Sequence, residues 1–311
     1  MTLHEGHQHG GHVHGHAHAP QSFGTAFALG TLLNVALVAI QIVYGILAHS
    51  IALLADAGHN LGDGLGLLLA WGAYALARWH PTERYTYGFR SASILAPLLN
   101  AAILLVATGA IIWEAIRRFL EPPVVAGTAV MVVAAIAVVL NALAAWLFMA
   151  GSRRDLNIRG AFLHMAADAG VSFGVVIAGG AILLTGWHWI DPLVSLAISA
   201  VIVWGTWGLL RDAVTLSMQG VPREIDPADV RGYLEQLPGV ADVHDLHIWA
   251  MSTTETALTC HLVMPDGAPG DAFFTRLSRE LHDRFGIGHP TVQIEVGEAA
   301  HPCRLAPEHV V

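Results

Sequence analysis

The chain has 311 residues, of which 54% are hydrophobic and only 13% are charged, and its mean hydropathy is +0.55. Soluble domains carry about 25% charged residues, so this density leaves too little polar surface to cover a water-soluble globule. The net charge of −9 and the lack of a basic patch exclude nucleic acid as a partner. Because the apolar residues stand in long blocks, the composition predicts an α-helical membrane protein embedded in a lipid bilayer.

Six apolar blocks follow one another along the chain, separated by short polar segments. Each block exceeds the about 20 residues that a helix needs to cross about 30 Å of hydrocarbon. We therefore expect a domain of six transmembrane helices over residues 21–218. The location expected for it is a bacterial inner (plasma) membrane. The blocks are residues 23–47, 51–77, 93–119, 124–150, 161–185 and 190–216.

Arginine sets the expected orientation, because the chain contains no lysine. In a six-helix topology Arg117 and Arg118 fall on one side, and the other arginines near the membrane fall on the opposite side. The positive-inside rule places the arginine-rich side in the cytoplasm, and both termini with it. The arginines on that side are Arg78, Arg84, Arg90, Arg153, Arg154, Arg159, Arg211 and Arg223.

Residues 1–20 form a low-complexity tail in which histidines alternate with glycine, valine and alanine. Such a segment has too few apolar residues to bury a core, so we expect it to be disordered and to bind metal loosely. An affinity tag is the alternative origin, but the irregular spacing favours a natural tail. Its histidines are His4, His7, His9, His12, His14, His16 and His18.

Residues 222–297 are predicted to form a small cytoplasmic α/β domain, followed by a C-terminal tail over 298–311. The apolar periodicity predicts the element order α-β-β-α-β, which is typical of a ferredoxin-like fold. The expected elements are a helix over 226–237, strands over 240–250 and 254–264, a helix over 271–285 and a strand over 291–296.

Two membrane blocks each carry a histidine four positions before an aspartate, namely His59 with Asp63 and His164 with Asp168. That spacing stacks both side chains on one helical face, one turn apart. Ionisable groups in a spanning helix are costly and usually functional. Two such faces would offer two imidazole nitrogens and two carboxylate oxygens, a tetrahedral set for Zn²⁺. A single pair would equally fit a hydrogen bond that stabilises helix packing, but two copies favour a shared metal.

Asp56 lies three residues before His59 and shares its helical face, about one turn further out. Two roles fit this position: an acceptor for the imidazole N–H of His59, or a proton-binding group. Asn34, Gln41 and Asn141 are uncharged polar residues in other membrane blocks. For them we expect hydrogen bonds between helices rather than contact with the ion.

The segment Ser-Ile-Ala-Leu-Leu-Ala-Asp-Ala-Gly-His-Asn-Leu-Gly-Asp at 50–63, with His-Met-Ala-Ala-Asp at 164–168, resembles the cation diffusion facilitator family. The resemblance implies a homodimeric metal/proton antiporter that exports zinc by alternating access. Its paired His-Asp sets match the zinc-preferring branch, with Cd²⁺ and Co²⁺ as further candidate substrates. Some relatives bind a second metal between the second and third helices, but residues 81–90 contain no histidine, so none is expected there.

The same resemblance implies a zinc site in the cytoplasmic domain, at the dimer interface. The family's ligand positions correspond to His244, His261 and Glu295, and each is an acceptable zinc ligand. His247 lies an odd number of residues from His244, on the other face of a regular strand, and is therefore left out.

A further set of candidate metal ligands lies near the C-terminus. A second metal bound by His289, His301 and Cys303 is as plausible as three exposed tail residues. Cys260, in a strand-like run, is interpreted as a plain buried thiol.

Three classes of function remain open for such a chain. Transport requires reversible binding, which imidazole and carboxylate ligands allow, and protons compete for the same groups. A membrane zinc metalloenzyme would need an open water position and a general base, so the closed four-ligand set predicts no enzyme. A membrane-bound metal sensor would use the cytoplasmic domain, but no DNA-reading segment follows it. Transport is the favoured interpretation.

Overall fold

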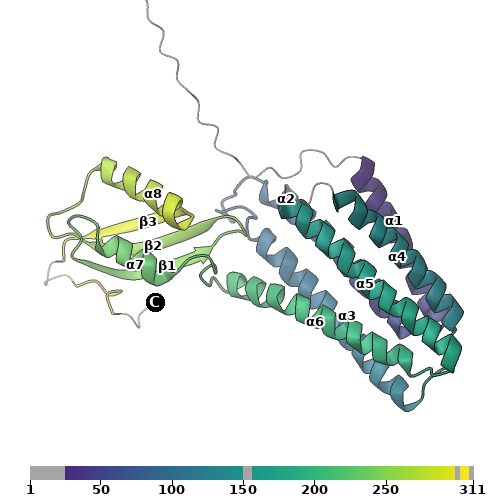
Figure 1. Ribbon diagram of the computed structural model, residues 1–311. Helices are drawn as coiled ribbons and strands as arrows, with labels where there is room; N and C mark the ends of the chain where they lie inside the picture. The colour runs from purple at the N-terminus through teal and green to yellow at the C-terminus, as the bar shows by residue number, and fades with distance from the viewer. Residues whose placement is uncertain (1–24, 150–155, 298–301, 308–311) are drawn as a thin grey trace, which may run out of the picture.

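The computed structural model describes residues 25–149, 156–297 and 302–307. It consists of a helical bundle and a small α/β domain, with α6 running from the bundle toward the sheet (Figure 1). The predicted histidine-rich tail lies outside the described residues. The bundle helices are α1 Thr25–Leu47, α2 Ile51–Ala77, α3 Ala92–Leu120, α4 Gly127–Met149, α5 Leu156–Thr185 and α6 Ile190–Ser217.

Four of the helices in the described part of the chain, α3 to α6, are long and apolar enough to cross a membrane. α1 contributes a shorter apolar stretch, Asn34–Leu47. α2 has the length of a spanning helix, but Asp56, His59 and Asp63 lower its hydropathy. The chain is therefore an integral membrane protein, and the count of six spans stays a prediction.

The start of α2 is fixed by α6. Ser50 caps the helix by accepting a hydrogen bond from the Leu53 N–H, and the Asp191 carboxylate of α6 accepts from Ile51 N at 2.7 Å. Ser50 Oγ also donates to Asp191. Because the first N–H groups of a helix lack partners within it, this shared cap sets where α2 begins relative to α6.

The α/β domain has the predicted order of elements. β1 pairs antiparallel with β2, and β2 pairs parallel with β3, so β2 is central in the sheet. β3 begins four residues before the predicted strand and includes Pro290, which an edge strand tolerates because one side of its backbone needs no partner. The elements are α7 Pro227–Glu235, β1 Asp242–Ala250, β2 Thr256–Val263, α8 Asp271–Phe285 and β3 Ile287–Glu295.

Both helices of this domain cover one face of its sheet. Tyr233 of α7 donates to Glu280 of α8 at 3.0 Å, and its ring contacts that of Phe285. Cys260 and Leu262 of β2 point into the core beneath the helices. Since side chains alternate along a strand, His261 lies on the opposite face.

The turn between β1 and β2 contacts the start of α3. Arg90 forms an ion pair with Glu255, and Ser93 Oγ accepts a hydrogen bond from Thr253 N at 3.1 Å. Nearby, the ring of Tyr87 meets that of His289 edge-on. The segment between α2 and α3, together with the start of α3, thus contacts the α/β domain through an ion pair, a hydrogen bond and a ring contact.

Candidate metal centre

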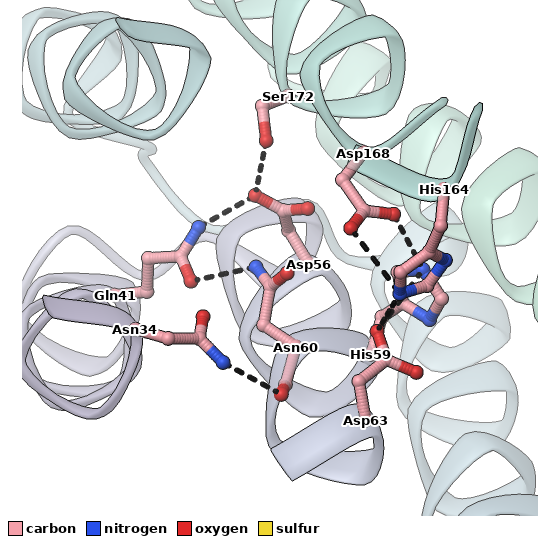
Figure 2. A network of polar contacts seen from close by, with 9 residues as sticks. All are labelled: Asn34, Gln41, Asp56, His59, Asn60, Asp63, His164, Asp168 and Ser172. Atoms are coloured by element: carbon pink, nitrogen blue, oxygen red, sulfur yellow. Dashed lines mark hydrogen bonds and ion pairs between the residues drawn. The ribbon is translucent and has the colours of Figure 1, made fainter. Parts of the chain in front are cut away.

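The two predicted His-Asp pairs face each other between α2 and α5, as Figure 2 shows. His59 Nε2 lies 3.1 Å from Asp168 Oδ1 and 3.8 Å from Asp63 Oδ2. His164 Nε2 lies 3.2 Å from Asp63 Oδ2 and 3.6 Å from Asp168 Oδ2. Each histidine therefore contacts the aspartate of the other helix more closely than the aspartate of its own.

These separations fit a tetrahedral zinc site. Ligands at about 2.0–2.2 Å from an ion, arranged tetrahedrally, lie about 3.3–3.6 Å from one another. The four nitrogen–oxygen distances run from 3.1 to 3.8 Å and bracket that range. One ligand atom from each of His59, Asp63 and Asp168 falls within 4.8 Å of the others. His164 contacts both aspartates and completes a set of two nitrogens and two oxygens for one small divalent ion.

The exposure of the site changes along the helices. The Asp63 and His164 side chains, nearest the end that meets the α/β domain, are 31% and 43% exposed. Asp168, one turn further, is only 3% exposed. Asp56 and Ser172, beyond it, are fully buried. The ligands nearer the α/β domain are therefore the more exposed, and the residues at the other end of the set are buried.

Asp56 does not act as an acceptor for His59. Its Oδ2 accepts from Gln41 Nε2 of α1 at 2.6 Å and from Ser172 Oγ of α5 at 3.0 Å. His59 Nδ1 is buried and has no hydrogen-bond partner among the described residues. Of the two roles predicted for Asp56, that of a hydrogen-bond acceptor for His59 is wrong, because the accepting oxygen of Asp56 is turned toward α1 and α5.

The uncharged polar residues of the bundle behave as predicted in two of three cases. Asn34 donates to the Asn60 carbonyl at 3.5 Å, and Gln41 also accepts from Asn60 Nδ2 at 3.3 Å, so both link α1 to α2. Asn141 is buried on α4, and its Nδ2 has no hydrogen-bond partner within the described ranges.

A second cluster lies on the open face of the three-stranded sheet. His244 Nε2 is 3.3 Å from Glu295 Oε2, and His261 Nδ1 is 2.8 Å from Glu295 Oε1. Cys303 Sγ lies 3.5 Å from His261 Nδ1. One ligand atom from each of the four side chains falls within 4.8 Å of the others. Imidazole, carboxylate and thiolate are all zinc ligands, so the set has the right composition for that ion.

The sequence groups Cys303 with His289 and His301 as candidate ligands of a second metal. The structure brings it to His244, His261 and Glu295, whereas His289 of β3 contacts Tyr87 instead. His301, the third member of the predicted group, lies outside the described residues. Cys303 follows the last strand without any periodic pattern, so only the folded chain shows that it returns to the sheet.

The electrostatics of the second cluster favour a negative Glu295. Burial raises the pKa of its carboxyl, but the hydrogen bond from Cys303 and the nearby His244 and His261 outweigh that effect and lower the pKa. A backbone hydrogen bond at Leu305 lowers the pKa of the Cys303 thiol, but the Glu295 carboxylate, burial and Asp245 together outweigh it and raise the pKa. The thiol therefore loses its proton most readily when a cation shares the site.

Cys260 is adjacent to His261 but takes no part in the cluster. It is buried in the core of the domain, and burial raises the pKa of its thiol to about 12. The interpretation of Cys260 as a plain buried thiol is confirmed.

Asp245 was not singled out from the sequence. It stands at a β-bulge between His244 and His247, with a positive φ of 51°. Its carboxylate contacts His261 Nε2 at 3.4 Å and His247 Nε2 at 2.9 Å. Asp245 thus orients His261 from the side opposite Glu295, while His247 stays outside the cluster.

Two family models match the chain, in the same order as its two structural parts. The cation efflux transmembrane domain matches residues 28–216, and the cation efflux protein cytoplasmic domain matches residues 222–296. Together they span the bundle and the α/β domain, including every residue of both candidate metal sites except Cys303.

Similar proteins of known function align over nearly the whole chain. A cadmium, cobalt and zinc/H(+)-K(+) antiporter of Bacillus subtilis is 34% identical over 292 residues, 92% of this chain and 94% of the relative. Zinc transporter ZitB of Escherichia coli is 36% identical, covering 94% and 95%. The metal cation efflux system protein CzcD of Cupriavidus metallidurans is 33% identical, covering 95% and 92%. The predicted resemblance is confirmed, and the chain belongs to the cation efflux, or cation diffusion facilitator, family.

Proposed function

We propose that this protein exports Zn²⁺ from the cytoplasm in exchange for protons, with Cd²⁺ and Co²⁺ as further substrates. The observation that carries the proposal is the crossed set of two imidazoles and two carboxylates between α2 and α5, at tetrahedral separations. The names of the relatives, which include zinc transport and antiport with H⁺, agree with it.

The ligand chemistry accounts for exchange. A zinc ion needs neutral imidazoles and ionised carboxylates, and the same atoms bind protons once the ion has left. In the absence of the ion each histidine already faces a carboxylate, so the site can hold protons through its His-Asp contacts. An acidic outer compartment therefore favours release of the metal, and a more alkaline cytoplasm favours its capture.

The direction of transport follows from exposure and topology. The more exposed ligands, Asp63 and His164, lie at the end of the site nearer the α/β domain. With six spans and both termini in the cytoplasm, as the arginine distribution predicts, this conformation receives the ion from inside. We further propose that the protein works as a homodimer in the bacterial inner membrane, with the α/β domain at the dimer contact, as the name of the relatives' dimerisation domain suggests.

The second cluster supports one alternative function, which is zinc sensing. Its His244, His261, Glu295 and Cys303 set would let the α/β domain sense zinc. We assign it a structural or regulatory zinc, because the transport site stands apart from it in the bundle. An enzymatic role is not proposed, since the four ligands in the bundle would leave no open position for an activated water.

The test of the proposed function is reconstitution. Vesicles containing the purified protein and an internal zinc-sensitive dye should take up Zn²⁺ when an outward-directed proton gradient is imposed. Collapsing the gradient with a protonophore should slow uptake. Zinc uptake that is indifferent to the gradient would contradict antiport, and no uptake above that of protein-free vesicles would contradict transport.

His59→Asp is expected to relax selectivity. The change replaces one nitrogen ligand by oxygen, and an oxygen-rich set fits larger or harder cations better than Zn²⁺. The ratio of cadmium to zinc flux, measured in the same vesicles, should rise. An unchanged ratio would show that His59 does not set selectivity.

Deleting residues 2–19 is expected to lower zinc uptake at limiting zinc but to leave the maximal rate unchanged. The segment carries seven histidines and is compositionally unable to form a core, so it can collect metal without taking part in the conformational change. The measurement is flux against zinc concentration for the deleted and full-length proteins. A lower maximal rate at saturating zinc would contradict this prediction.

A further inference from the structure

Three pairs of side chains face one another between α2 and α5, about one helical turn apart (Figure 2). Two of them are ligand pairs, and the third is formed by Asp56 and Ser172, whose Oγ donates to Asp56 Oδ2 at 3.0 Å. Ser172 stands four residues after Asp168, so it continues the ligand face of α5 by one turn. The two ligand pairs are His59 with Asp168 and Asp63 with His164.

Asp56 joins three helices through one oxygen atom. Its Oδ2 accepts from Gln41 of α1 at 2.6 Å as well as from Ser172 of α5, and Asp56 itself belongs to α2. Gln41 is held in turn, because its Oε1 accepts from Asn60 Nδ2 of α2 at 3.3 Å. Asp56, Gln41 and Ser172 are fully buried. Buried polar groups that lose their hydrogen-bond partners destabilise a fold, so this junction resists separation of the helices.

The two ends of the ligand set are therefore held differently. At the end toward the α/β domain, the side chains of Asp63 and His164 are partly exposed. At the other end, Asp168 is buried beside the junction of Asp56 and Ser172. The spacing of α2 and α5 near the ligands is thus set from the buried end.

We propose that Asp56 is a positioning residue of the transport site. Through Ser172 and Gln41 it holds α2 and α5 at the separation at which the four ligands reach one ion. It acts through helix geometry rather than by contact with the ion or with His59. This inference rests on the proposed function of the four ligands, and its test is metal binding rather than flux.

The experiment uses Co²⁺ as a spectroscopic probe of the transport site in the detergent-solubilised protein. Four-coordinate Co²⁺ absorbs visible light more strongly than six-coordinate Co²⁺, so both the affinity and the geometry of the site can be measured. In the reference protein the other metal-binding groups are removed by deleting residues 2–19 and by His244→Ala, His261→Ala and Cys303→Ser. A reference protein that binds no Co²⁺ with a four-coordinate spectrum would contradict the proposed transport site itself.

Two substitutions of Asp56 separate geometry from charge. Asp56→Asn keeps an oxygen that can accept from both Gln41 and Ser172, so the spectrum and the affinity should stay close to those of the reference. Asp56→Leu has a similar size but no acceptor, and Co²⁺ should bind about 10–100-fold more weakly with a reduced four-coordinate spectrum. Equal losses in both variants would show that the charge of Asp56 matters and would overturn the positioning role.

A matched pair of serines tests the link to α5. Ser172→Ala removes one hydrogen bond to Asp56 and should weaken Co²⁺ binding about two- to tenfold. Ser199→Ala removes an equally buried hydroxyl of α6 whose Oγ has no hydrogen-bond partner in the described part of the chain, and should have no effect. This pair decides the question even if Asp56→Leu fails to fold. Unchanged binding in Ser172→Ala, or equal losses in both serine variants, would overturn the proposal.

Discussion

Replacing Asp63 or Asp168 with alanine should abolish zinc flux in reconstituted vesicles while leaving a folded protein. Each aspartate faces a histidine of the opposite helix, at 3.2 Å for Asp63 and 3.1 Å for Asp168. Losing either one removes a charged ligand and leaves a three-ligand site. Because substitutions of groups that merely support metal ligands cost about 10–100-fold, we expect a loss of flux of more than about a hundredfold.

Asp168→Ala should lower the stability of the fold more than Asp63→Ala does. Asp168 is buried and Asp63 is partly exposed, so only Asp168→Ala removes a buried charge, together with its contact to His59. Asn141→Ala is the control for loss of a buried polar group, because Asn141 lies on α4 and its Nδ2 has no partner among the residues described. Flux at the wild-type rate in either aspartate variant, with equal amounts of folded protein in the vesicles, would remove the four-residue site from consideration.

The helices could be predicted well because the number of residues in each apolar run can be counted in the sequence. The predicted blocks and α1 to α6 agree to within a few residues at most ends. The largest difference is the start of α5, predicted at residue 161 and found at Leu156. Apolar runs show where a helix lies in hydrocarbon, whereas the backbone stays helical through polar residues such as Arg159.

The four residues of the proposed transport site could also be predicted, but not which of them contact one another. Spacing alone places His59 with Asp63 on one face, and His164 with Asp168 on another. That His59 meets Asp168, and His164 meets Asp63, follows from the antiparallel course of α2 and α5 in the folded bundle. Ser172 follows Asp168 by four residues, just as Asp168 follows His164. This repeated interval could have identified Ser172 as a residue on the ligand face of α5.

The role of Asp56 required the tertiary structure. Its short distance from His59 in sequence suggested a direct bond, but a side chain three residues away on a helix can also turn toward a different neighbour. Gln41, fifteen positions before it, and Ser172, on another helix, take its accepting oxygen. Local periodicity carries no information about such contacts, because they depend on which helices lie side by side.

The α/β domain should gain stability from zinc, and His261→Ala should remove about half of that gain. His261 is the centre of the second cluster: its ring contacts Glu295, Cys303 and Asp245. The domain has a core of its own, which includes the fully buried Leu234, Leu258 and Leu281, so residues 222–311 are expected to fold in isolation. Zinc at 100 times its dissociation constant would then stabilise the domain by about 2.7 kcal/mol.

Thermal melting of residues 222–311, with and without Zn²⁺, measures this effect. In a domain of this size about 1 kcal/mol shifts the melting temperature by about 4–8 °C, so zinc should raise it by about 10–20 °C. A tenfold weaker affinity in His261→Ala would remove about 1.4 kcal/mol, or about 6–11 °C of that rise. Cys260→Ala is the matched control: it alters the neighbouring residue on the opposite face of β2, so it should lower the starting temperature but keep the zinc-induced rise.

The same variants connect this cluster to transport. If zinc holds two α/β domains together, Zn²⁺ should shift the wild-type domain toward dimer in size-exclusion chromatography, and His261→Ala should weaken that shift. Full-length His261→Ala should then transport more slowly but not lose transport, because the ligands in the bundle are intact. Equal zinc-induced rises in the melting temperature of wild type and His261→Ala would show that His261 is only a strand residue. Regulation by this domain would then have no basis in metal binding at the cluster.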